Sequence, residues 1–369
     1  MSEKIKVLHV VVDMGHGGYE NYLMNVFRKL DRDKFEFNFL VFKGHECYFE
    51  KEIESLGGKV FHCTFSDDFR YFKARKQLKK IVNENHFDIL HCHTHYYSFL
   101  FLKYYSKRIT NVILHSHNSR SDKSLKGRIV SLLSKYPSRK KYNNLACSDI
   151  AGKYFFGRKG RYDICPNCID SETFAYNEKR RDSLHERYGI DKNTLVLGHI
   201  GRFTAIKNHK FILDIAEQLS DKGIEYKLCL CGVGALKDKI ANRVENTVEL
   251  KKHVIFLEPG DVKGYYSLFD ILLLPSLAEG FPLTLLESQA AGCYSLASDT
   301  ITKEVVLTDK IEYLPISSPQ SWADRIIEIS NNSLNYNRLT CNKAVKESQY
   351  DSINATEFLE NYYLRICKK

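Results

Sequence analysis

The sequence predicts an α/β protein built from two parallel sheets, each covered by helices on both faces. Short apolar runs alternate with segments of helical periodicity along both halves of the chain, the pattern of parallel strands joined by crossover helices. The alternation loosens near residues 162–170 and then resumes. A chain of 369 residues is also long enough for two separate cores.

The first half opens with a strand, a glycine-rich loop and a helix. The predicted elements are strand Ile5–Val12, loop Asp13–Gly18, helix Tyr19–Leu30, strand Glu36–Phe42, helix Phe49–Leu56, strand Lys59–Cys63, helix Tyr71–Asn85, strand Asp88–Cys92 and strand Asn111–His115. The loop does not match a dinucleotide fingerprint, because Glu20 stands where the last glycine belongs. Either its glycines let the backbone approach a ligand, or this is a plain turn.

The second half repeats the alternation and ends in a helical tail. The predicted elements are strand Leu195–Ile200, helix His209–Leu219, strand Tyr226–Cys231, helix Ala235–Asn246, strand Val254–Leu257, helix Val262–Phe269, strand Ile271–Leu274 and tail helix Ser352–Lys369. Another helix is predicted after Phe281, with Pro282 in its first turn.

Two loops of the second half carry charged residues suited to a nucleotide sugar. Glu287 lies in a helix otherwise made of Leu, Ser, Thr and Ala, where a buried carboxylate needs hydrogen bonds, and the helix start before it offers an anion site. Arg202 and Lys207 follow the first strand of this half, at the sheet edge where such folds bind ligands, and their side chains suit a diphosphate. The alternative is that all three side chains are simply solvated.

Two histidine clusters and one cysteine pair contain residue types that commonly bind metal ions. They are His91-Cys92-His93-Thr94-His95, His115-Ser116-His117-Asn118 and Cys165-Pro166-Asn167-Cys168. No closed set of ligands appears, and the C-x-x-C pair has no partner pair. We therefore expect no metal, histidines that contact a polar substrate, and a structural role for the cysteines.

Composition indicates a globular protein of the cytoplasm. The chain has 43% hydrophobic and 27% charged residues, 11 scattered cysteines, no signal peptide and no run of apolar residues long enough to span a bilayer. The net charge of +10 is concentrated in Arg120–Lys141, a basic amphipathic segment. It suits an anionic membrane surface, which would place the protein on the inner face of the plasma membrane. It also fits a solvated helix face. No nucleic-acid motif accompanies the charge.

These motifs together resemble the GT-B glycosyltransferases of family 4. GGYE, HSHN, PNCID, GRFTAIKNH, CGVG and EGFPLTLLESQAAG cover nearly the whole chain. The last resembles the E-x7-E signature of that family, and HSHN resembles its bacterial capsular and exopolysaccharide members. Two departures are Cys168, in place of the glycine of N-G-I-D, and Glu258-Pro259-Gly260, in place of a glycine after the base-binding strand.

The resemblance implies two Rossmann-like domains facing across a cleft. It divides the chain into an acceptor-binding domain at residues 1–175, a nucleotide-sugar-binding domain at 176–350 and a helix at 351–369 that crosses back to the N-terminal domain. It implies a retaining, metal-independent hexosyltransferase (EC 2.4) without a cofactor. Its donor is a nucleoside diphosphate sugar, expected to be a UDP-sugar. Its acceptor is a saccharide or a polyprenyl-linked saccharide used in capsule or exopolysaccharide synthesis.

The resemblance also assigns residues to the reaction. Arg202 and Lys207 match cations on the diphosphate, Glu279 an acid beside the donor sugar, and His117 a histidine near its hydroxymethyl group. Glu287 matches the carboxylate that binds the ribose. The other residues matched to donor binding are Gly17, Gly18, Leu257, Gly280, Phe281, Pro282 and Leu283.

Two other functions stay open at this point. A nucleotide-sugar epimerase has the same architecture, but it needs acid and base carboxylates in the cleft that the sequence does not identify. A non-catalytic nucleotide-sugar-binding subunit is the other alternative, and it would bind donor without transferring sugar.

Overall fold

The chain forms two compact units in the computed structural model. Unit 1 comprises Met1–Cys168 and Ser352–Lys369, and unit 2 comprises Ile169–Asp351. The structure describes residues 3–15, 17–63, 71–93, 109, 111–117, 142–258, 260, 262–332, 334 and 336–368, with only the backbone for 71–75. The division falls at 168/169, a few residues before the expected 175/176, and residues 352–369 group with unit 1.

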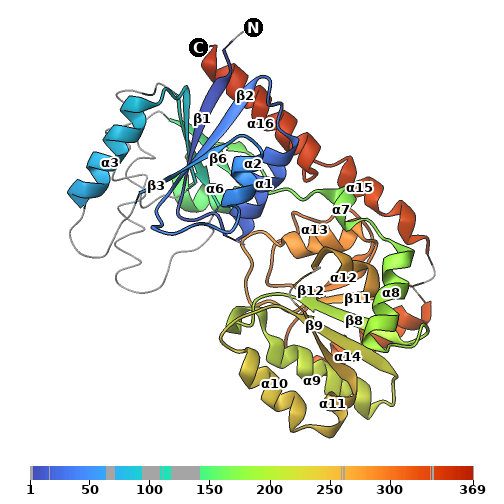
Figure 1. Ribbon diagram of the computed structural model, residues 1–369. Coiled ribbons are helices and arrows are strands. Elements are labelled where there is room, and N and C mark those ends of the chain that lie inside the picture. Colours follow the sequence, from blue (N-terminus) through green and yellow to red (C-terminus); the bar gives the residue numbers. More distant parts are fainter. Residues whose placement is uncertain are drawn as a thin grey trace. The chain divides into compact units, whose positions relative to one another are not determined.

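Unit 1 contains a seven-stranded parallel sheet in the order β3-β2-β1-β4-β5-β6-β7 (Figure 1). The strands are β1 Ile5–Val11, β2 Phe35–Val41, β3 Lys59–His62, β4 Ile89–Cys92, β5 Asn111–Ser116, β6 Asn143–Ala146 and β7 Asp163–Ile164. The described helices are α1 Gly18–Lys29, α2 Glu50–Ser55, α3 Tyr71–Glu84, α6 Asp149–Phe156 and α16 Ser352–Cys367. The strand order reverses between β1 and β4, where folds of this class bind their ligands.

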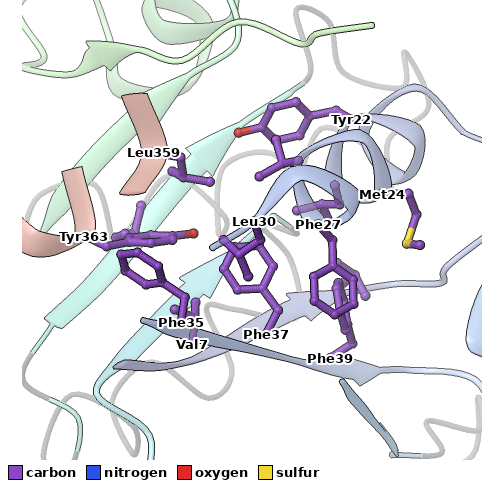
Figure 2. Packing of buried hydrophobic residues seen from close by; sticks show 14 of the residues in the cluster. Val7, Tyr22, Met24, Phe27, Leu30, Phe35, Phe37, Phe39, Leu359 and Tyr363 are labelled. Carbon is purple, nitrogen blue, oxygen red and sulfur yellow. The ribbon is translucent and has the colours of Figure 1, made fainter. Parts of the chain in front are cut away.

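Helix α16 packs against α1 and completes the core of unit 1 (Figure 2). Phe27 of α1 stacks on Phe37 of β2, with ring centroids 5.5 Å apart. Tyr363 and Leu359 of α16 are fully buried in the same cluster. Burying one such side chain contributes about 1.5–3 kcal/mol. The last helix of the chain is therefore a structural part of unit 1.

Unit 2 contains a six-stranded parallel sheet in the order β10-β9-β8-β11-β12-β13 (Figure 1). The strands are β8 Leu195–Ile200, β9 Tyr226–Cys231, β10 Val254–Leu257, β11 Ile271–Leu274, β12 Tyr294–Ser298 and β13 Ile311–Leu314. The helices are α7 Ser171–Phe174, α8 Glu178–Tyr188, η2 Ala205–Lys207, α9 His209–Asp221, α10 Lys237–Glu245, α11 Val248–His253, α12 Val262–Leu268, α13 Leu283–Ala290, α14 Pro319–Asn332, η3 Arg338–Thr340 and α15 Asn342–Lys346.

Two hydrophobic clusters cover the opposite faces of this sheet. On one face α9 and α14 meet through Phe211 and Trp322, whose ring centroids are 5.7 Å apart. On the other face lie α12 and α13, which bury Tyr266, Leu285 and Leu286. The predicted helix over 235–246 is α10, and the short α11 after it was not predicted. None of the helices in the described part of the chain is long and apolar enough to cross a membrane.

Candidate active site

Three loops meet at the carboxyl edge of the unit 2 sheet. The loop after β8 is hydrogen-bonded to the loop after β9, where the N–H of Phe203 donates to the carbonyl of Val233 at 2.9 Å. It is also tied to the loop after β11, since the N–H of Leu277 donates to the carbonyl of Ile206 at 2.8 Å. Backbone pairing therefore brings together motifs that lie far apart in the sequence.

Lys207 and Glu279 form an ion pair within these loops. Lys207 Nζ lies 2.7 Å from Glu279 Oε1, and the two side chains are only 18% and 14% exposed. Asn208, which follows Lys207, has a left-handed backbone with φ of 56°, and its amide nitrogen donates to the carbonyl of Pro275 at 3.2 Å. This turn ends η2 and fixes the direction in which the Lys207 side chain leaves the loop.

Glu287 is held in the second turn of α13 by a tyrosine. The hydroxyl of Tyr266, on α12, donates a short hydrogen bond to Glu287 Oε2. Burial raises the pKa of Glu287, whereas the hydrogen bond from Tyr266 and the charges of Lys207 and Lys263 act to lower that pKa. The field of Lys207 therefore reaches both acids of the E-x7-E motif.

The start of α13 offers backbone groups for an anion. Pro282 is the N-cap residue, one position before the first helical turn in which it was predicted, because its ψ of 78° is not helical. No side chain of the described residues caps this end of α13. The N–H groups of its first turn and its positive dipole end are the features that bind phosphate in other folds. Gly280 and Phe281 lead into this turn, and Leu283 is its first helical residue.

The remaining unit 2 candidates, Arg202 and Leu257, lie at the ends of strands. Arg202 is exposed in the loop after β8, and no described residue forms an ion pair with it. Leu257 is the last residue of β10 and is buried. The next residue, Glu258, pairs with Arg187 at 2.5 Å, and its carbonyl accepts a hydrogen bond from the Tyr265 hydroxyl at 2.8 Å.

Gly17, Gly18 and His117 belong to unit 1. Gly17 is the N-cap residue of α1, and Gly18 is its first residue. A Cβ at Gly17 would lie 2.0 Å from Glu20 Oε2, so a larger residue there would make the Glu20 carboxylate move. His117 follows β5, and both of its ring nitrogens have partners: His93 at 2.9 Å and Asn167 at 3.3 Å. A sugar hydroxyl would have to displace one of them.

Five histidines form two hydrogen-bonded chains at the carboxyl edge of the unit 1 sheet. In one chain His117, His93 and His9 follow one another, with His93 3.0 Å from His9. In the other, His91 lies 2.7 Å from the Tyr363 hydroxyl and 3.2 Å from His115. Burial lowers the pKa of His9 and His117 to about 3, and burial is also the main cause that lowers the pKa of His91 and His93. These four rings are therefore neutral at pH 7.

Neutral rings satisfy the second chain completely. His115 Nε2 lies 3.2 Å from the carbonyl of Cys165, which can only accept. If His115 is neutral, its other nitrogen accepts from His91, and His91 in turn accepts from the Tyr363 hydroxyl. Two trios, His9–His91–His93 and His93–His115–His117, have nitrogens close enough for a metal ion. A metal ion bound there would take the place of the hydrogen bonds between the rings. Because these nitrogens could hold a metal ion, the expectation that the protein binds none stays a prediction.

The sequence did not identify the partners of these residues. Tyr266 and Tyr363 come from helices with no motif, and Cys165 reaches the histidines only through its carbonyl. One signal was present: a buried tyrosine usually finds a hydrogen-bond partner. Cys165 Sγ also lies 3.1 Å from the Tyr22 hydroxyl, inside the core. His95, Asn118 and the basic segment Arg120–Lys141 lie outside the described residues.

Comparison with known proteins agrees with the motifs. Residues 180–347 match the model of the glycosyl transferases group 1, and residues 16–173 match that of glycosyltransferase family 4. A putative glycosyltransferase, EpsF, of Bacillus subtilis is 32% identical over 337 residues, which are 88% of each chain. The chain belongs to the family 4 glycosyltransferases. A glycosyltransferase of this family transfers a sugar residue, so this protein is a transferase.

More distant relatives of this glycosyltransferase match over most of their length. CapH, a capsular polysaccharide biosynthesis glycosyltransferase of Staphylococcus aureus, is 23% identical over 87% of this chain and 90% of its own. An Escherichia coli protein named UDP-Gal:alpha-D-GlcNAc-diphosphoundecaprenol alpha-1,3-galactosyltransferase is 22% identical over 80% of each chain. The crystal structure of Anabaena HepE with UDP and glucose superposes with a TM-score of 0.76 at 16% identity, over 98% of this chain and 100% of that one. The glycosyltransferase therefore has the GT-B fold.

Proposed function

We propose that the protein is a retaining, metal-independent hexosyltransferase that uses a UDP-sugar. It transfers a hexose or N-acetylhexosamine to a hydroxyl of a saccharide acceptor, lipid-linked, in the synthesis of a surface polysaccharide. The observation that carries the proposal is the arrangement around Lys207, whose charge acts on both Glu279 and Glu287 beside an uncapped helix start. The names of CapH and of the Escherichia coli galactosyltransferase support the acceptor class.

The charges of the site suit departure of a diphosphate. Breaking the anomeric C–O bond places negative charge on the diphosphate and positive charge on the sugar. Lys207, Arg202 and the start of α13 would stabilise the first charge. Lys207 has three N–H donors, so its ammonium can keep Glu279 and still donate to a phosphate oxygen. Three cationic or dipolar groups of the protein thus take the part that a metal ion plays in other transferases.

Glu279 does not act as the nucleophile in the proposed reaction. One of its oxygens is held by Lys207, which makes a carboxylate less nucleophilic. The acceptor hydroxyl instead attacks on the face from which the diphosphate leaves and gives its proton to the departing phosphate oxygen. This course retains the anomeric configuration and needs no protein base.

Substitution of Lys207 tests the proposal. Lys207→Ala should lower kcat by roughly 10²–10³-fold, about 3–4 kcal/mol, because one preorganised donor to the leaving group is lost. Transfer from a radiolabelled UDP-sugar at saturating donor gives the measurement. Lys210→Ala, an exposed lysine on α9, is the matched control and should keep wild-type kcat. A kcat for Lys207→Ala within threefold of wild type would contradict the proposal.

A further inference from the structure

The donor site depends on a residue outside the family motifs. We propose that Tyr266 is a positioning residue for the nucleotide: its hydroxyl holds one oxygen of Glu287, so that the other oxygen faces the ribose. The inference rests on the proposed function, because Glu287 is the group assigned to the ribose. Tyr266 itself is fully buried on α12 and touches no substrate.

The contact between Tyr266 and Glu287 is rigid on the tyrosine side. The ring of Tyr266 packs edge-on against Phe174, with centroids 5.6 Å apart, and lies 6.2 Å from the ring of Phe269. The hydroxyl points to Glu287 Oε2. An ionised carboxylate only accepts hydrogen bonds, so this hydroxyl is fixed as the donor. Packing therefore sets the direction of the hydrogen bond that orients the carboxylate.

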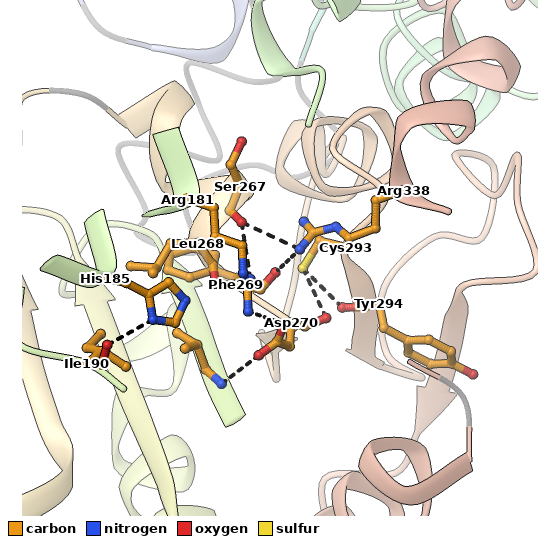
Figure 3. A network of polar contacts seen from close by, with 12 residues as sticks. Arg181, His185, Ile190, Ser267, Leu268, Phe269, Asp270, Cys293, Tyr294 and Arg338 are labelled. Atoms are coloured by element: carbon orange, nitrogen blue, oxygen red, sulfur yellow. Dashed lines mark hydrogen bonds and ion pairs between the residues drawn. The ribbon is translucent and has the colours of Figure 1, made fainter. Parts of the chain in front are cut away.

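Two arginines hold the end of α12 in place (Figure 3). Arg338 donates to the carbonyl of Tyr266 at 2.8 Å and to that of Phe269 at 2.9 Å. Arg181 donates to the carbonyl of Leu268 at 2.7 Å and pairs with Asp270 at 2.9 Å. Cations at a helix C-terminus are stabilising. These bonds fix the helix that carries Tyr266.

Arg338 also joins α12 to the helix that carries Glu287. Its guanidinium donates to the carbonyl of Ala291, at the end of α13, at 3.0 and 3.1 Å. One side chain thus connects the ends of both helices, and the hydrogen bond between Tyr266 and Glu287 connects the helices a second time. Sliding of one helix along the other would break both connections. The carboxylate of Glu287 is therefore held in one place before any ligand arrives.

The Tyr266 hydroxyl has a second effect, which is on the charge state of Glu287. The groups that act on its carboxylate are Tyr266, Lys207 and Lys263, and all three act against the burial that raises its pKa. Without the Tyr266 hydroxyl, Glu287 would take up a proton at higher pH. A protonated carboxyl would bind the ribose hydroxyls more weakly, because hydrogen bonds to charged groups are the stronger ones.

The test is nucleotide binding by Tyr266→Phe, measured by calorimetry with UDP and with 2′-deoxy-UDP from pH 5 to 9. We expect about a tenfold weaker affinity for UDP, as for the loss of one hydrogen bond to a charged group, and a smaller loss for 2′-deoxy-UDP. The pH below which UDP binding falls should rise. Tyr226→Phe is the matched control, because Tyr226 is fully buried in unit 2 and its hydroxyl donates to the carbonyl of Ala216 at 2.6 Å. Its UDP affinity should equal that of wild type.

The results with the variants bear on the inference alone, whereas UDP binding by the wild-type protein also bears on the proposed function. If Tyr266→Phe has the same UDP affinity and the same pH profile as wild type, the inference is overturned. The inference is also overturned if the variant loses affinity equally for both nucleotides at every pH, because such a loss indicates a merely structural role. Should Tyr266→Phe fail to fold, Glu287→Gln decides: its UDP binding must keep only the pH dependence that the terminal phosphate of UDP contributes itself, and a pH profile equal to that of wild type overturns the inference. A wild-type protein that binds no UDP overturns the proposed function and the inference together.

Discussion

At the scale of single residues, Glu287 is placed where its charge is costly. Burial raises its pKa, and three neighbouring groups reduce that shift without cancelling it. A buried carboxylate lowers the stability of the fold, as residues of functional sites often do. An exposed glutamate would ionise at a lower free-energy cost, but no neighbouring group would orient its carboxylate.

The sign of this shift predicts how Glu287→Gln changes stability. Because the pKa of Glu287 is raised on folding, its ionisation lowers stability as the pH rises through that pKa, and nothing is lost below its ordinary value of 4.5. Glu287→Gln should therefore melt at higher temperature than wild type near pH 8, with a difference that fades towards pH 4. Calorimetry without nucleotide measures this.

Glu312 supplies a control of opposite sign. Arg325 lies 2.5 Å from Glu312 and lowers the pKa of that carboxyl, so its contribution to stability is present above the ordinary pKa and is lost as the pH falls. Glu312→Gln should melt below wild type near pH 8. A lower melting temperature for Glu287→Gln at pH 8 would contradict the account of Glu287.

Residue chemistry explains which site residues the sequence revealed. Lys207, Glu279 and Glu287 stood out because charges are unusual next to apolar strands and in apolar helices, and the structure brings them into one field. Tyr266 did not stand out, because a tyrosine in a buried helix is ordinary until its partner is known. That partner lies 21 residues away on another helix.

At the scale of elements, the loops after β8 and β9 depend on a close backbone contact. Gly232 has φ of 152°, and a Cβ at this position would lie 2.0 Å from the carbonyl oxygen of Gly201. A side chain there must push the Gly201–Arg202 segment away from its place beside Lys207. The glycine is therefore a requirement of the site as well as of the fold.

Gly232→Ala should weaken UDP binding by at least tenfold and lower the melting temperature. The matched control is Gly223→Ala, since Gly223 has φ of 69° but open space around its Cβ position. That control should cost about 1–2 kcal/mol of stability from backbone strain alone and leave UDP affinity unchanged. Equal UDP affinity in the two variants would show that the contact with Gly201 has no role in the site.

The elements predicted from sequence were those with a clear period. Apolar runs located β1, β2, β8, β9 and β11 to within one residue at each end. The strand β12 was missed because YSLAS lies directly after a helix with no polar break, and β13 because IEYL alternates over only four residues. Helix α14 was missed although Trp322 and Ile326 are spaced as on one face.

At the scale of the whole molecule, the two units should respond differently to acid. Among its described residues, unit 1 holds four buried histidines with lowered pKa, His9 and His117 at about 3 and His91 and His93 well below 6.5. Unit 2 holds two, His199 and His209. A neutral buried histidine stabilises fully above pH 6.5 and loses about 1.4 kcal/mol per pH unit as the pH falls towards its folded value.

The stability of unit 1 should therefore fall more steeply than that of unit 2 as the pH falls from 6.5 to 4. Calorimetry with and without UDP separates the two transitions, because we expect the nucleotide to stabilise unit 2. His9→Gln should make the pH dependence of the unit 1 transition shallower by about one proton, while the exposed His45→Gln should not. A unit 1 transition no more pH-dependent than that of unit 2 would contradict the neutral state of these rings.

The sequence pattern indicated two units. It did not indicate that the C-terminal helix α16 packs in unit 1. The expected division at 175/176 lies just after the stretch where the alternation of strands and helices loosens, and the two units of the structure divide at 168/169. Nothing in the tail itself says that Tyr363 reaches His91 of β4 at 2.7 Å, because the two lie 272 residues apart. The resemblance to a family supplied that expectation, and tertiary packing supplies its reason.

The return of α16 to unit 1 sets an order of events during synthesis. Unit 2 is one continuous stretch, Ile169–Asp351, so it can fold as soon as it has left the ribosome. Residues 1–168 are made earlier, but their core is complete only once α16 has been made and packs against α1. The usual vectorial order, in which the N-terminal domain is completed first, therefore cannot apply to the full core of unit 1. A nascent chain stalled before residue 352 lacks α16 and should therefore expose the apolar surface of α1 that this helix covers.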